Sequence, residues 1–115
     1  MTATRTVPLD ASVSAVFDAT GDATASLGPT TYGTTWEIQG LSTSSDSTDE
    51  CELRVFKNNP NSAGSMVLNT FAGNADSSAG DNIVLRFGER LHFVWSNGTP
   101  NARATGVIFG VQRGR

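Results

Sequence analysis

The chain has 115 residues, of which 37% are hydrophobic and 17% are charged, so it can form one domain with one core. Its 26 Ser and Thr, 12 Gly and single Lys favour a turn-rich β protein over a helical one. The net charge of −3, with no clustered basic residues, argues against sequence-independent nucleic-acid binding.

The charges are unevenly distributed along the chain. Residues 1–53 carry eight acids and one base, a net charge of −7, whereas residues 54–115 carry seven bases and three acids, a net charge of +4. Either acidic and basic strands lie next to one another in the sheets, or complementary faces meet between subunits.

Neither a disulfide nor a membrane segment is expected. Cys51 is the only cysteine, so it has no intramolecular partner. No apolar run approaches the roughly 18–20 residues of a membrane span, and the N-terminus "MTATRTVPLDAS" lacks the apolar stretch of a signal peptide. We therefore expect a protein made in a cytoplasm, with no membrane partner.

The N-terminal segment predicts an arm or an edge strand over residues 1–12, followed by a sandwich domain over residues 13–115. Pro8 confines a strand at 5–9 to an edge or an arm, and residues 12–20 are either extended or form a short helix. The candidate docking residues of this segment are Arg5, Val7, Pro8 and Leu9.

The middle of the chain predicts further strands, at 23–29, 34–41, 51–57, 65–71 and 82–87. The strand at 51–57 is the clearest, with Cys51, Leu53 and Val55 facing inward. The polar residues 42–50 either continue a strand or form a loop. Residues 72–82 predict a loop, because their side chains tolerate unusual φ and hydrogen-bond their own backbone.

The segment "RLHFVWSNGTPNARATGVIFG" predicts two facing strands of one sheet. Leu91, Phe93 and Trp95 would lie opposite Val107, Phe109 and Val111, and residues 96–102 would turn the chain. The whole pattern of short alternating runs, spaced by about ten residues, predicts an all-β protein. We expect a single β-sandwich or jelly-roll-like domain of about eight short antiparallel strands.

No catalytic, cofactor or metal site is expected. His92 alternates with apolar residues on the polar face of its strand, and Cys51 lies on an inward face, so both are interpreted as structural. Zinc would need more Cys or His ligands. The loop at 73–82 offers oxygen ligands for calcium but lacks the ligand rhythm of an EF-hand, and we interpret it as a turn-rich loop.

Two aromatic residues do not follow the core pattern and are candidates for contact with a glycan or a partner. Tyr32 lies in the turn sequence "GPTTYG", and Phe56 has the outward parity of its strand. Asp76 and Asp81 of the polar loop are included as candidate contacts.

Several segments together resemble small β-sandwich virion proteins of tailed phages, especially those of actinobacterial hosts. The resemblance covers residues 23–112 and rests on a Gly-Pro before a Trp strand, a Gly-Asn-x-Asp loop and a hairpin followed by Ala-Thr. These residues are Gly28, Pro29, Trp36, Gly73, Asn74, Asp76, Trp95, Gly98, Pro100, Ala104 and Thr105. The chain departs from that pattern at residues 97–101, where more glycine is expected.

The resemblance implies a non-enzymatic virion structural protein, assembled in a host cytoplasm, that needs no cofactor. It would decorate the capsid as a minor capsid protein or form a minor tail component, with other virion proteins and further copies of itself as partners. The alternative is a carbohydrate- or receptor-binding module that contacts a host surface glycan.

Overall fold

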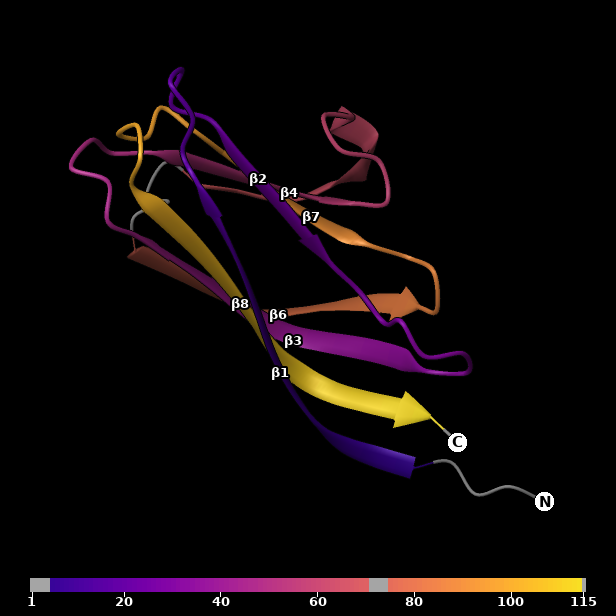
Figure 1. Cartoon of the computed structure of the whole chain (residues 1–115). Helices are drawn as coiled ribbons and strands as arrows, with labels where there is room; N and C mark the ends of the chain where they lie inside the picture. Colours follow the sequence, from indigo (N-terminus) through magenta and orange to yellow (C-terminus); the bar gives the residue numbers. More distant parts are fainter. Residues whose placement is uncertain (1–4, 71–74, 115) are drawn as a thin grey trace.

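The computed structural model describes residues 5–70 and 75–114, and it describes their side chains except those of residues 75–81. Within this part of the chain the backbone forms eight strands and one short 3-10 helix, η1 (Ala63–Ser65) (Figure 1). The strands form two four-stranded antiparallel sheets, called A and B, that face each other. The expected all-β sandwich of about eight antiparallel strands is confirmed.

Sheet A contains the long strands and sheet B the short ones. In spatial order, sheet A consists of β1 (Arg5–Val16), β8 (Arg103–Gly114), β3 (Thr35–Ser45) and β6 (Ala75–Arg86). Sheet B consists of β2 (Ala23–Leu27), β7 (Leu91–Ser96), β4 (Glu52–Lys57) and β5 (Met66–Thr70). Because a strand lengthens by about 3.3 Å per residue, sheet A extends past sheet B. The molecule is accordingly elongated, with extents of 53 × 23 × 23 Å.

The strand pairing is that of a jelly roll. In sheet A, β1 pairs with β8 and β3 with β6, whereas in sheet B β2 pairs with β7 and β4 with β5. This order arises when a long antiparallel ribbon folds over itself. The pairs β1–β8 and β3–β6 then lie in one sheet, and the pairs β2–β7 and β4–β5 lie in the other. The jelly-roll-like part of the prediction is confirmed.

The core lies between the sheets and follows the alternation of the strands. Leu91, Phe93 and Trp95 of β7 are fully buried, as expected. Trp95 stacks on Phe93 with 5.6 Å between the ring centroids. The indole N–H of Trp95 donates a 2.9 Å hydrogen bond to the Thr43 hydroxyl oxygen, which satisfies a buried polar group.

β1 is one continuous edge strand. Its residues from Arg5 to Val16 pair one by one with β8. The extended alternative for residues 12–20 is therefore correct as far as Val16, and the helical alternative is wrong. The strand runs across the expected boundary between residues 12 and 13, and Leu9 belongs to the core.

The polar segment 42–50 combines both alternatives that the sequence left open. β3 continues to Ser45, and the residues after it form the connection to β4. Between Ile38 and Gly40 the register of β3 shifts against both of its neighbours, which marks a β-bulge.

Part of the loop predicted at residues 72–82 is a strand. β6 begins at Ala75, and Asp76 pairs with Thr43 of β3. The prediction is wrong from residue 75 onward because pairing with a neighbouring strand satisfies the backbone of residues that have little strand propensity of their own. Residues 71–74 lie outside the described residues.

The two faces of β8 are the reverse of the expected ones. Ala104 and Ile108 are buried in the core, while Val107, Phe109 and Val111 have the opposite parity and lie on the outer face of sheet A. The expectation failed because residues 107–109 are three consecutive apolar residues that fit either parity. The two strands also lie in different sheets, β7 in sheet B and β8 in sheet A, so they do not form a hairpin.

Candidate functional site

The connections between strands gather at the two ends of the sandwich, because every strand runs antiparallel to its neighbours. One end, which we call the acidic end, contains the connections 17–22, 46–51 and 97–102. The other end, which we call the basic end, contains the first residues of β1, the last residues of β8 and the connections 28–34, 58–65 and 87–90. Arg5 and Gly114, which begin β1 and end β8, pair with each other at the basic end (Figure 1).

Carboxylates concentrate at the acidic end. Its three described connections carry no Lys or Arg and five acids, namely Asp18, Asp22, Asp46, Asp49 and Glu50. The Asp18 carboxylate accepts hydrogen bonds from the Thr20 hydroxyl (2.7 Å) and from the Thr20 and Asp22 backbone N–H groups (2.9 and 3.0 Å). These hydrogen bonds lower the pKa of Asp18, so its negative charge persists at neutral pH.

Thr99 connects two of the loops at the acidic end. Its hydroxyl oxygen accepts hydrogen bonds from the backbone N–H groups of Thr48 (3.0 Å) and Asp49 (3.2 Å). Its own backbone N–H donates a 2.9 Å hydrogen bond to the Ser47 hydroxyl. The β7–β8 connection therefore holds the acidic β3–β4 connection in place.

The β7–β8 connection itself is a tight turn. Asn97 and Asn101 adopt left-handed backbone conformations with φ of 65° and 72°, which asparagine tolerates better than most residues. Gly98 donates a 3.0 Å backbone hydrogen bond to the Gly21 carbonyl. A Cβ on Gly98 would collide with the buried Phe17 ring. This segment turns the chain and joins it to the β1–β2 connection.

Cations concentrate at the basic end. Of the seven Lys and Arg residues that the structure describes, five lie at this end or on the strand residues that adjoin its connections, namely Arg5, Lys57, Arg86, Arg90 and Arg113. Two acids lie among them: Glu37 forms a 2.9 Å ion pair with Arg113, and Glu89 lies 3.9 Å from Lys57. These five cations and two acids give the basic end a formal charge of +3. The three described connections of the acidic end carry −5, and the strand residues of opposite charge that adjoin them, Glu52 and Arg103, cancel each other.

Glu89 fixes the β6–β7 connection at the basic end. Its carboxylate accepts hydrogen bonds from the Arg86 backbone N–H (2.7 Å) and from the Asn58 side-chain amide (3.2 Å), and these bonds lower the pKa of Glu89. The Asn58 side-chain oxygen accepts a 3.0 Å hydrogen bond from the Arg90 backbone N–H. The connection that carries Phe87 is therefore held against the end of β4.

Two exposed aromatic residues lie at the basic end. Tyr32 is 81% exposed and Phe87 is 48% exposed. The rings meet edge to face, with their centroids 5.6 Å apart. Exposed aromatic residues of this size are typical of protein contact surfaces.

A groove crosses the outer face of sheet B. Three adjoining hollows of about 360, 340 and 340 Å³ share Asn61 in their walls. The connection 58–65 contributes Pro60, Asn61 and Ala63 to these walls, and in Figure 1 it lies over this face of sheet B. The other polar residues of the walls include Thr24, Ser26, His92, Ser96, Glu52, Arg54 and Asn69.

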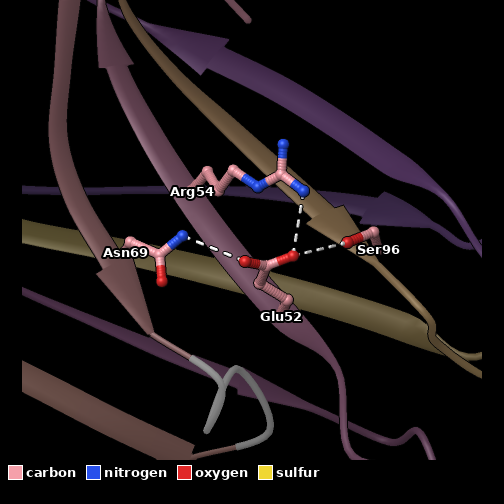
Figure 2. Close-up of polar contacts among 4 residues, drawn as sticks. All are labelled: Glu52, Arg54, Asn69 and Ser96. Atoms are coloured by element: carbon pink, nitrogen blue, oxygen red, sulfur yellow. Dashed lines mark hydrogen bonds and ion pairs between the residues drawn. The ribbon is translucent and has the colours of Figure 1, made fainter. Parts of the chain in front are cut away.

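Glu52 organises one side of this groove (Figure 2). Its carboxylate forms a 3.0 Å ion pair with Arg54 and accepts hydrogen bonds from the Asn69 amide (3.0 Å) and the Ser96 hydroxyl (3.4 Å). Arg54, followed by Asn69, lowers the pKa of Glu52. The charges of Glu52 and Arg54 are mutually neutralised, so this wall offers mainly hydrogen-bonding groups.

The outer face of sheet A carries an apolar row. Across the register, Glu37 separates Val84 of β6 from Val111, and Asp10 lies opposite Phe109. The row therefore runs along β8, where Val107, Phe109 and Val111 share the outward parity, and Pro8 of β1 lies opposite Val111. Phe109 is 45% exposed, and its ring lies over Gly40, where a Cβ would collide with it. We call this set the outer apolar row.

The residues predicted as glycan or partner contacts differ in their exposure. Tyr32 is exposed, but Phe56 is only 2% exposed. Phe56 has the predicted outward parity, yet it lies beside Asn61, Ala63 and Met66 under the connection 58–65, and its ring is not available at the surface. Asp76 and Asp81 lie in β6, and their side chains are outside the described residues, as are residues 73 and 74 of the segment interpreted as a turn-rich loop.

The four candidate docking residues all lie in β1. Arg5, Val7 and Pro8 are exposed, with Val7 at 36%, whereas Leu9 is buried in the core and cannot contact a partner. Pro8 lies opposite Val111 and so belongs to the outer apolar row.

His92 and Cys51 lie where the sequence indicates. His92 is half-buried in the wall of the groove, and Cys51 is fully buried, which raises the pKa of its thiol. Within residues 5–70 and 75–114, no group of three or more His, Cys, Asp or Glu could hold a metal ion. The same residues contain no helix with the length and hydropathy to cross a membrane.

The chain matches no known protein-family model, and no curated protein is significantly similar to it in sequence.

Proposed function

We propose that this protein is a non-enzymatic structural component of a phage particle, bound to the capsid as a decoration protein or to the tail as a minor component. Two features support the proposal. Residues 23–112 resemble virion proteins of this kind, and jelly rolls occur among viral capsid domains. Because a fold alone does not define a function, the proposal depends on the side chains that the surface presents.

The outer apolar row on sheet A carries the proposal. An exposed Phe109, flanked on β8 by Val107 and Val111, lies on a central strand that pairs with neighbours on both sides. Apolar side chains fixed on a rigid sheet face fit a protein surface better than a catalytic role. The row also includes Pro8 of the segment that was expected to dock.

Incorporation into particles tests the proposal. Particles of the phage that encodes this chain should contain it, as detected by mass spectrometry and by immunogold labelling of the surface. Phe109→Asp should abolish incorporation while the purified variant keeps the wild-type circular dichroism spectrum. Val67→Asp is the matched control, because Val67 is also exposed, at 38%, but lies on β5 of sheet B.

Two results would overturn the proposal. One is the absence of the chain from purified particles that contain the other virion proteins. The other is normal incorporation of Phe109→Asp, which would show that the outer apolar row does not contact the particle.

The groove on sheet B favours a second function, the binding of a carbohydrate. Its walls combine the amides of Asn61 and Asn69, the hydroxyls of Thr24 and Ser96 and the guanidinium of Arg54. Such a set can donate to and accept from the hydroxyl groups of a sugar. Lectin domains are also found among jelly rolls.

A glycan array separates the two candidate surfaces. If the groove binds a host glycan, Arg54→Ala should abolish binding and Tyr32→Ala should leave it intact, because Arg54 lines the groove and Tyr32 does not. If instead Tyr32→Ala alone abolishes binding, the contact is the one that the sequence indicates. Absence of any glycan binding would refute this second function.

A further inference from the structure

We infer that copies of this chain associate head to tail, with the basic end of one copy contacting the acidic end of the next. The contact would centre on Tyr32 and Phe87, surrounded by the cations of the basic end. The inference goes beyond the proposed function and holds for the isolated protein, whichever particle it belongs to.

The two ends of the molecule carry charges of opposite sign. The acidic end has a formal charge of −5 and the basic end of +3, at opposite ends of a molecule 53 Å long. The Debye length is about 8 Å at an ionic strength of about 0.15 M, so the two ends are screened from each other within one molecule. Only two different molecules can bring these charges together.

Both ends present exposed charged side chains that lie outside the ion pairs of the structure. Among the described residues, neither Arg5 nor Arg86 forms an ion pair with a carboxylate, and neither do Asp46 and Glu50 with a base. All four residues are exposed. Charges of this kind steer association and fix its orientation.

The basic end presents two exposed aromatic side chains, Tyr32 and Phe87. Tyr32 is 81% exposed, and its edge-to-face contact with Phe87 fixes the pair as a unit. Interfaces commonly have an aromatic centre within a charged rim. The acidic end offers an exposed Pro100 in the β7–β8 connection, an apolar surface on which an aromatic ring can pack.

The arrangement determines the kind of assembly. Two basic ends repel each other, and so do two acidic ends, so a symmetric end-to-end dimer is disfavoured. A contact between unlike ends is heterologous. Because the two ends lie at opposite extremes of the long axis (Figure 1), repetition of the contact gives open chains of molecules.

Charge reversal at one end at a time tests the inference. The basic-end variant is Arg5→Glu with Arg86→Glu, and the acidic-end variant is Asp46→Lys with Glu50→Lys. The control is Asp10→Lys, which reverses an exposed charge in the middle of β1. Sedimentation velocity gives the average mass of each protein, and thermal unfolding confirms that each variant is folded.

The wild type and Asp10→Lys should associate at an ionic strength of about 0.01 M and dissociate at about 1 M, where the Debye length falls to about 3 Å. The basic-end variant should lose self-association, because its ends then carry formal charges of −1 and −5. The acidic-end variant should associate less than the wild type, because its acidic end falls from −5 to −1. An equimolar mixture of the two end variants should associate again, since unlike ends are restored between the two proteins.

Three outcomes would overturn the inference. The wild type could be monomeric at low ionic strength up to millimolar concentration, as expected if the ends contact other proteins. The mixture of end variants could remain monomeric although the wild type associates. Asp10→Lys could lose association as well, which would place the contact on sheet A.

Discussion

Gly106→Ala is expected to destabilise the sandwich, because the added methyl group has no space. A Cβ on Gly106 would lie 2.6 Å from the Phe93 ring, whereas carbon atoms pack at about 3.5–4.0 Å. Phe93 is fully buried and stacked on Trp95, so its ring cannot move without disturbing the core. Overpacking costs about 1–3 kcal/mol, which lowers Tm by about 4–12 °C in a domain of this size.

Gly40→Ala is the matched control. A Cβ on Gly40 would also collide with an aromatic ring, that of Phe109. Phe109, however, is 45% exposed on the outer face of sheet A, and its ring can rotate into solvent. We expect a loss of about 1 kcal/mol or less.

Urea unfolding followed by tryptophan fluorescence measures both variants. The double variant Gly106→Ala with Phe93→Leu should be less destabilised than the sum of its single changes, because the smaller side chain relieves the collision. The reasoning is refuted if Gly106→Ala unfolds at the wild-type urea concentration, or if Gly40→Ala loses as much stability as Gly106→Ala.

Three further predictions concern buried or hydrogen-bonded groups. Thr43→Val removes the acceptor of the Trp95 indole N–H and should destabilise the protein by about 1–3 kcal/mol in urea unfolding; an unchanged midpoint would mean that the indole finds another acceptor. Arg54 lowers the pKa of Glu52, so the stability that Glu52 contributes is present above about pH 4.3 and is lost as pH falls through the lower folded-state pKa. Thermal unfolding should therefore show a smaller loss on acidification for Glu52→Gln than for the wild type, and equal losses would contradict this. Burial raises the pKa of Cys51, so a thiol reagent should label it only on unfolding, and rapid labelling of the folded protein would show that the thiol is accessible.

The uneven charge along the sequence becomes a separation of charge between the two ends of the folded molecule. From the sequence, the acidic first half and the basic second half could form neighbouring strands of one sheet or complementary faces that meet between subunits. In the structure, the acids of the connections 17–22 and 46–51 come together because both connections follow strands of sheet A that run the same way. Arg5, at the other end of β1, joins the basic end although it belongs to the acidic half. The charges are sorted by the direction of the strands rather than by position in the chain.

The candidate surfaces were only partly predictable. Tyr32 stood out because it interrupts a turn sequence without an alternating pattern, and it is exposed. Phe56 has outward parity but is buried. Parity shows which face of a strand a residue occupies, but not whether another segment covers that face. The inward face of β8 was assigned to Phe109 because residues 107–109 fit either parity. Phe87 shares the parity of the buried Leu85 but is exposed because β6 ends at Arg86.

The sequence by itself determined the all-β class, the approximate position of most strands and the burial of residues such as Leu53 and Trp95. These follow from alternation and turn residues, which are local properties. The tertiary structure alone decided the inward face of β8, the extension of β6 over residues 75–81 and the separation of charge between the ends. Each of these depends on which strands pair and on which sheet covers them, and such non-local contacts leave little trace in a single sequence.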